Sequence, residues 1–154
     1  MNNDKEINGI SSKQYFWVIS TLLDHFRDSC SKNPLGIDLN LMCGKILNFV
    51  KIRPIYENRE DGCVDHGLIG LLQLAISLVK FSLPWCRSPE QSDALDYVFD
   101  MIFLPPTKMT SNFPKCKSHV SRMTAYDLLV EMARSSEVSF LRLHHNLMRQ
   151  NSKG

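Results

Sequence analysis

Cys63 and His66 stand at Cys-x-x-His spacing, the arrangement in which a cysteine and a histidine can share a metal ion. A structural zinc site needs about four ligands, usually supplied as two such pairs. The other notable histidines, His144 and His145, are adjacent and lack the spacing of two ligands on one helix face. We therefore interpret Cys63 and His66 as surface or interface residues at a helix start, and the sequence predicts no metal site and no cofactor.

A second kind of chemistry that the residues could support is cysteine nucleophilic catalysis. It requires a base and an oxyanion site around the thiol, whereas every cysteine here falls in a context typical of core or loop. Their odd number and wide spacing favour reduced thiols over a disulfide framework, as in the cytosol or nucleus. The N-terminus has no basic segment followed by an apolar one, so we expect an intracellular protein, cytoplasmic or nuclear. The five cysteines are Cys30, Cys43, Cys63, Cys86 and Cys116.

A small basic cluster is the first candidate for partner binding. From Lys108 onward the chain holds eight Lys or Arg against three Asp or Glu, although the net charge of the whole chain is only +2. This excess could steer an acidic partner, or the cluster could be a solvated loop and helix start. No exposed aromatic residues are interleaved with it, so we predict no nucleic-acid binding. The cluster consists of Lys115, Lys117, His119 and Arg122.

Trp17 and Trp85 are the large residues expected to be partly exposed. Either could anchor a protein partner, because aromatic side chains dominate interface energetics. The alternative is that each covers the edge of a helical core. We retain Trp85 as a candidate partner-binding residue.

These residues must be positioned by helices, and the stretch from Asp65 to Leu83 is predicted to be the central one. It is apolar almost all round, which predicts a helix covered on most of its surface. The stretch is too interrupted for a membrane span, which needs roughly 20 apolar residues, and Pro84 ends it. Its polar or glycine positions form one narrow seam, made of His66, Gly70, Gln73, Ser77 and Lys80.

Helical periodicity predicts five further helices around the central one. Their expected N-caps are Ser11 or Ser12, Asp38, Ser88, Ser118, and Ser135 or Ser136. The second helix is expected to bury a stripe made of Leu39, Met42, Ile46, Phe49 and Val50. The fifth is expected to run to Arg134 and to bury Ala125, Leu128, Leu129 and Met132.

The sequence thus predicts an all-α chain of six amphipathic helices in successive antiparallel pairs. Residues 11–150 are expected to form one helical domain, with flexible ends at 1–10 and 151–154. The architecture is either a segment of an armadillo- or HEAT-like α-solenoid or a compact helical bundle. The sixth helix has the weakest apolar pattern, which suggests that a following segment is needed to cover it.

One part of the sequence resembles the giant ubiquitin-specific proteases. The resemblance lies in Pro114-Lys115-Cys116-Lys117-Ser118-His119, in Ser121-Arg122, and in Ala125-Tyr126-Asp127-Leu128-Leu129-Val130-Glu131-Met132. Asp65-His66-Gly67-Leu68-Ile69-Gly70-Leu71 and Phe103-Leu104-Pro105 extend it, so that it covers residues 65–132.

The resemblance implies a non-catalytic helical scaffold that lies just upstream of a protease domain and positions substrates or partners for deubiquitination. The implied partners are ubiquitin, ubiquitinated substrates and the neighbouring catalytic domain. The cysteine and histidine boxes of that family are absent, so no catalytic residue carries over. Two alternatives stay open: a free-standing helical adaptor that binds ubiquitin or a peptide in a groove that includes Trp85, and a cysteine hydrolase.

Overall fold

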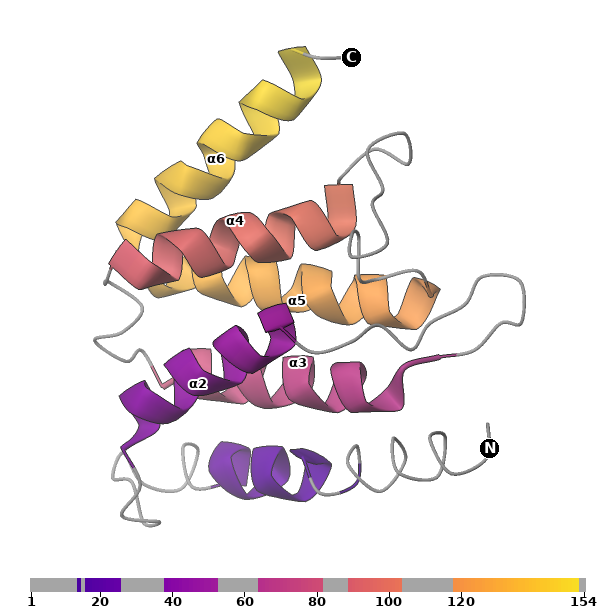
Figure 1. Ribbon diagram of the computed structural model, residues 1–154. Coiled ribbons are helices and arrows are strands. Elements are labelled where there is room, and N and C mark those ends of the chain that lie inside the picture. The colour runs from indigo at the N-terminus through magenta and orange to yellow at the C-terminus, as the bar shows by residue number, and fades with distance from the viewer. Residues whose placement is uncertain are drawn as a thin grey trace.

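The computed structural model describes residues 14, 16–25, 38–52, 64–81, 89–103 and 118–152. Residues 16–25 are helical, and Figure 1 shows this helix without a label beside the five labelled ones. The prediction of an all-α chain is confirmed, since no strand occurs in the described ranges. The labelled helices are α2 (Leu39–Ile52), α3 (His66–Val79), α4 (Pro89–Phe103), α5 (His119–Ser135) and α6 (Glu137–Ser152).

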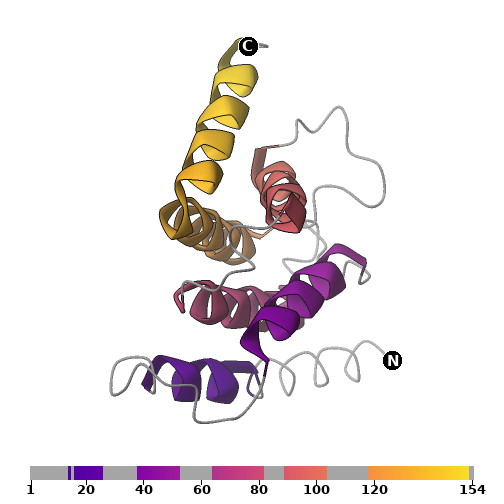
Figure 2. The ribbon, with the colours of Figure 1, turned by 90° about the vertical axis from the view of Figure 1, so that its left-hand side faces the viewer.

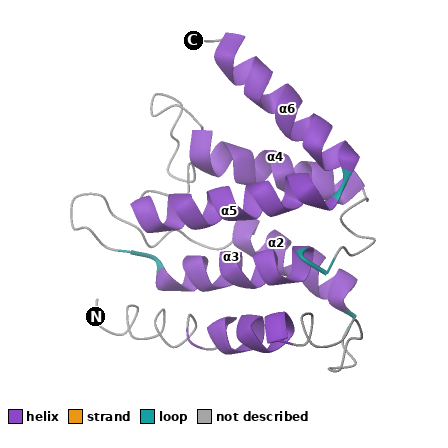
Figure 3. Ribbon diagram, turned by 180° about the vertical axis from the view of Figure 1, so that it is seen from behind, coloured by secondary structure: helices purple, strands orange, loops and turns teal. Residues whose placement is uncertain are grey.

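Consecutive helices run in alternating directions, as the sequence predicts (Figure 1). Figure 2 shows two layers: helix 16–25, α3 and α5 are stacked in one, and α2 and α4 lie in the other. Figure 3 shows the first layer from its own side, with α3 and α5 side by side. Helix α6 packs on both α4 and α5, and its contacts with α4 run from Arg142 to Gln150 (Figure 1). These layers do not show a solenoid repeat, which stays a prediction.

Helix α3 is the central helix, as its composition predicts. The Asp65 carboxylate caps its start by accepting a hydrogen bond from the Leu68 backbone N–H at 3.0 Å. Most of its residues are buried, and even Gly70 and Ser77 of the polar seam are covered. None of the helices among the described residues is long and apolar enough to cross a membrane.

Helix α2 confirms its predicted stripe in part, since Leu39 and Val50 are buried and Met42 and Ile46 are partly buried against the core. Phe49, expected in the core, is 49% exposed, whereas Cys43 is fully buried. The contact runs along Leu39, Cys43, Leu47 and Val50. This spacing of four, four and three residues follows one side of a helix. Phe49, next to Val50, points about 100° away from that side and so faces outward.

Helices α5 and α6 begin at the predicted serine caps. The Ser118 hydroxyl accepts a hydrogen bond from the Ser121 backbone N–H at 3.1 Å. The Ser136 hydroxyl accepts one from the Ser139 backbone N–H, also at 3.1 Å. The predicted inner face of α5 is confirmed, since the four side chains expected there are all buried: Ala125, Leu128, Leu129 and Met132.

Candidate functional site

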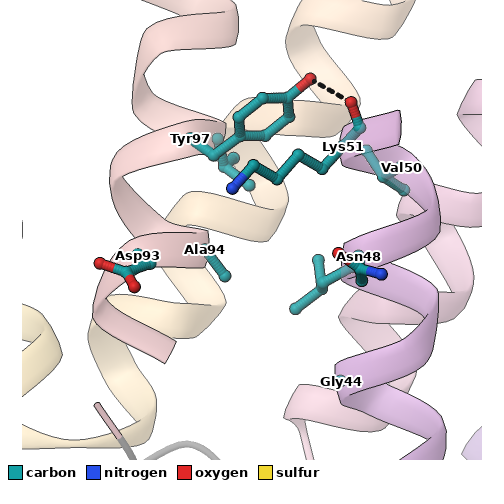
Figure 4. Close-up of a pocket in the computed structure, with 9 residues that line it drawn as sticks. Gly44, Asn48, Val50, Lys51, Asp93, Ala94 and Tyr97 are labelled. Atoms are coloured by element: carbon teal, nitrogen blue, oxygen red, sulfur yellow. Dashed lines mark hydrogen bonds between the residues drawn. The ribbon is translucent and has the colours of Figure 1, made fainter. Parts of the chain in front are cut away.

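A groove lies between α2 and α4. Figure 4 shows the two helices facing each other across it. It holds about 310 Å³, near the lower end of the range of small-ligand sites. Its lining residues are Gly44, Leu47, Asn48, Val50 and Lys51 from α2, and Asp93, Ala94, Tyr97 and Val98 from α4.

Small residues on facing helices help to keep this groove open. Gly44 lies inside α2, where a glycine costs roughly 1 kcal/mol of helix stability relative to alanine. Ala94 lines the groove from α4. Neither residue has a side chain long enough to reach across the groove. The apolar part of the lining comes instead from the side chains of Leu47 and Val98.

Polar groups close one end of the groove. The Tyr97 hydroxyl donates a hydrogen bond to the Lys51 backbone carbonyl at 3.1 Å, which joins α4 to the last turn of α2 (Figure 4). The Lys51 side chain extends from α2 toward α4, and Asn48 lies one turn further down α2. An apolar floor beside a cation and an amide fits an apolar side chain of a peptide whose backbone or carboxylate offers acceptors.

A polar network attaches α6 to α4. The Asp96 carboxylate accepts hydrogen bonds from both Nε and Nη2 of Arg142, the Nε bond measuring 2.9 Å, and from Asn146 Nδ2 at 2.8 Å. Partial burial alone would raise the pKa of Asp96, but the hydrogen bonds from Arg142 and Asn146 hold that pKa below its ordinary value of 3.8. The same contact raises the pKa of Arg142.

Asp100 lies one turn after Asp96 and behaves in the opposite way. Partial burial and the neighbouring Asp96 charge raise the pKa of Asp100, and the nearby Arg149 opposes them only in part. Two carboxylates on the same helix thus differ because only Asp96 accepts hydrogen bonds from α6.

The last carbonyls of α4 are satisfied by side chains from the two helices packed on it. Arg122 Nη2 of α5 donates to the Ile102 carbonyl at 3.2 Å, and Gln150 Nε2 of α6 donates to the Phe103 carbonyl at 3.1 Å. The final carbonyls of a helix have no partner within it. These two bonds therefore cap α4 and tie the three helices together at one end.

The predicted partner-binding residues are placed only in part. His119 is the first residue of α5 and is exposed, and Arg122 is exposed while it caps α4. Lys115, Lys117 and Trp85 lie outside the described residues, so the cluster as a whole stays a prediction. Trp17, the other candidate anchor, is 57% exposed on helix 16–25.

The Cys-x-x-His spacing occurs twice in the sequence. Cys116 and His119 repeat the spacing of Cys63 and His66. The prediction of no metal site rested on the first pair alone and did not include the second. Both histidines begin helices that pack on each other, α3 and α5, but both cysteines lie outside the described residues. Within the described ranges, no three His, Cys, Asp or Glu side chains form a group that could hold a metal ion.

The described part of the chain contains one cysteine, Cys43, a fully buried thiol in α2 that forms no disulfide. His66, which begins α3, is partly buried, and its Nδ1 atom has no hydrogen-bond partner.

The groove between α2 and α4 was not predicted from the sequence. Its lining residues are ordinary helix residues, and they come together only through the packing of α2 on α4.

Comparison with known proteins shows that the chain is similar in sequence to part of large ubiquitin hydrolases. It is 36% identical over 138 residues to human ubiquitin carboxyl-terminal hydrolase 34 and 34% identical over 138 residues to the mouse protein of that name. It is also 32% identical over 150 residues to the Drosophila melanogaster ubiquitin carboxyl-terminal hydrolase puf.

These matches cover 90% or more of this chain but only 4% of each relative. No family model matches the chain, and no solved structure matches it. The chain is therefore homologous to a small part of these large hydrolases.

Proposed function

We propose that the chain is a non-catalytic helical scaffold segment of a large deubiquitinating enzyme, and that it positions substrates or partners for protein deubiquitination. The extent of the match carries this proposal: nearly the whole chain aligns, yet it aligns with only 4% of each relative. A helical segment of this size within a much longer chain suits a positioning role.

The described residues support the non-catalytic part of the proposal. A cysteine hydrolase needs a thiolate with access to substrate and to a base. Cys43 is fully enclosed by the core and offers no such access. The remaining cysteines lie outside the described ranges, so the experiment must test them directly.

The first test measures turnover of a ubiquitin–fluorophore substrate by the purified chain, with an active deubiquitinase as positive control. We expect no turnover above buffer. Turnover that is abolished by replacing one of the five cysteines with serine would overturn the non-catalytic assignment.

The second test measures scaffold binding. The ¹⁵N-labelled chain is titrated with ubiquitin, and the amide spectrum is followed. Localised shifts on exposed residues support a ubiquitin-positioning role, whereas an unchanged spectrum removes ubiquitin from the proposed partners.

A free-standing adaptor that binds a peptide is the second candidate function, and the α2–α4 groove favours it. Replacement of Ala94 by Leu would fill the groove from α4 without touching the Tyr97 hydrogen bond. If the groove binds the peptide, A94L should abolish binding, while R134A, on the exposed surface of α5, should leave it unchanged. Equal binding by A94L and the parent chain would exclude the groove.

A further inference from the structure

Helix α6 buries very little of its side-chain surface. Among its described residues only Ser139 and Asn146 are buried, and both are polar. Leu143, which is partly buried, is the one apolar side chain in the described part of α6 that packs against the core. Helices in proteins are stabilised chiefly by the burial of an apolar face. Helix α6 therefore receives little of this stabilisation.

Polar side chains attach α6 to α4 instead. The Asp96 carboxylate accepts hydrogen bonds from Arg142 and Asn146, a contact that we call the latch. Gln150 donates to the last carbonyl of α4, and the positive charge of Arg149 is also near Asp96. The side chains of Arg142 and Asp96 are 43% and 31% exposed, so water can replace each partner at a modest cost in free energy.

The start of α6 is stabilised within the helix itself. The Ser136 hydroxyl accepts a hydrogen bond from the Ser139 backbone N–H, and the two hydroxyls lie 2.8 Å apart. Ser136 has an extended backbone and separates α6 from the end of α5. These bonds do not depend on α4, so α6 can keep its first turn when it moves relative to the other helices.

The other helices keep their core without α6. The cluster of buried apolar side chains takes its members from helix 16–25, α2, α3, α4 and α5, and none from the described residues of α6. Helix α3 packs on α2 and α5, and α4 packs on α5 and α2. Removal of α6 from its place would thus leave this cluster intact.

Regions with few buried apolar contacts open at a lower free energy than the core of a protein. We propose that α6 opens from α4 and α5 as one unit while those helices stay folded, and that the latch controls how often it opens. A docked and an opened α6 offer different surfaces to a partner. The latch would therefore regulate the contacts that the chain makes, a consequence that rests on the proposed scaffold function, whereas the opening itself does not.

Native-state amide hydrogen exchange of the ¹⁵N-labelled chain tests the opening. Exchange is followed by NMR without urea and at urea concentrations below the unfolding transition. We expect the amides of α6 to exchange at least about tenfold faster than those of α3. Because the opening of α6 exposes less surface than unfolding of the whole chain, the exchange rates of α6 should rise less steeply with urea.

Two arginine variants test the latch. Arg142→Ala removes the bidentate partner of Asp96 and should speed exchange in α6 about fivefold. Arg134→Ala removes an exposed arginine that pairs with Glu131 within α5, and it should leave exchange in α6 within about twofold of the parent chain. Both arginines are exposed, so both variants should keep the helical spectrum of the parent chain.

Three outcomes would overturn the inference. The first is exchange in α6 at the rate and urea dependence of α3, which would make α6 part of the main cooperative unit. The second is an equal effect of R142A and R134A on exchange in α6. The third is loss of protection in α4 or α5 at the same rate as in α6. The turnover and ubiquitin titration experiments do not depend on this opening, so the scaffold proposal is tested separately.

Discussion

Asp96 and Arg142 show how one pair of side chains can hold a whole helix in place. Helix α6 exposes most of its large apolar side chains. Burial of an apolar face, which usually holds a helix against its neighbours, therefore contributes less to its docking. A carboxylate that accepts both Nε and Nη2 of one guanidinium has the two-point geometry of the stronger ion pairs. The side chains of Arg142 and Asp96 are 43% and 31% exposed, so solvent screens part of the attraction.

We predict that Arg142→Ala lowers the free energy of unfolding by about 1 kcal/mol, because the Asp96 carboxylate loses its bidentate partner. Urea denaturation followed by circular dichroism measures the effect. Arg134→Ala is the matched control, since Arg134 makes a more exposed pair with Glu131 within α5, and it should change stability by less than about 0.5 kcal/mol. Equal effects of the two substitutions would refute the anchoring role of Arg142.

The pKa of Asp96 gives this contact a pH dependence with a definite sign. Because the folded-state pKa lies below the ordinary value of 3.8, the ionised form is favoured by folding. Its contribution is complete above that ordinary value and is lost as the pH falls through the lower, folded-state pKa. The stability difference between the parent chain and Asp96→Asn should therefore stay constant from about pH 5 to 8 and shrink toward about pH 3. A difference that grows on acidification would contradict the assignment.

The repeated Cys-x-x-His spacing leads to a metal test. We predict that the chain, purified without chelator, holds no stoichiometric zinc. His66 and His119 each begin a helix, where the positive end of the macrodipole disfavours a cation. Elemental analysis measures the zinc content. One zinc per chain that is lost in both Cys63→Ser and Cys116→Ser would show instead that the two pairs form a site.

At the scale of the element, the start of α3 depends on a single buried carboxylate. Asp65 is 4% exposed and caps α3, which packs on both α2 and α5. We predict that Asp65→Ala costs about 1 to 2 kcal/mol, whereas Asp65→Asn, which keeps the acceptor, costs much less. Thermal unfolding of the two variants measures the difference. If D65N were as unstable as D65A, the carboxylate charge rather than the cap would be responsible.

Helix ends and the central helix were predictable because their signals are local. Asp38, Ser118 and Ser136 each precede an apolar pattern, and each caps the helix that follows. Because α3 is apolar on almost every side, burial of most of its surface could be predicted. These features could be predicted without knowing which helices pack against them.

The faces of α2 and α6 were less predictable, because neighbours select them. Phe49 has the spacing of a core residue, yet the contact with α3 and α4 falls along Cys43 and Leu47 instead. In α6, the inward side is fixed by Asp96 of α4, 46 residues before Arg142 in the chain. The α2–α4 groove likewise requires Gly44 of α2 and Ala94 of α4 to line the same space, which no single helix pattern indicates.

At the scale of the whole molecule, large apolar side chains are exposed on several helices. Trp17 and Leu22 are exposed on helix 16–25 at one end of the stack, and Phe140 and Met148 on α6 at the other (Figure 1). Phe49 of α2 and Met123 of α5 are exposed between them. Exposed apolar side chains of this kind are candidates for the partner contacts of the proposed scaffold role.

The effect of a core substitution should depend on how many helices the substituted helix contacts. Leu72 is fully buried in α3. We predict that Leu72→Ala costs about 2 to 5 kcal/mol, because it opens a cavity in the helix that contacts both α2 and α5. Amide hydrogen exchange should show lost protection in α2, α3, α4 and α5 together. Phe49→Ala, on the exposed side of α2, should leave protection within about 0.5 kcal/mol of the parent chain. Loss of protection confined to α3 in L72A would mean that the layers unfold independently, and the stack would then not be one cooperative unit.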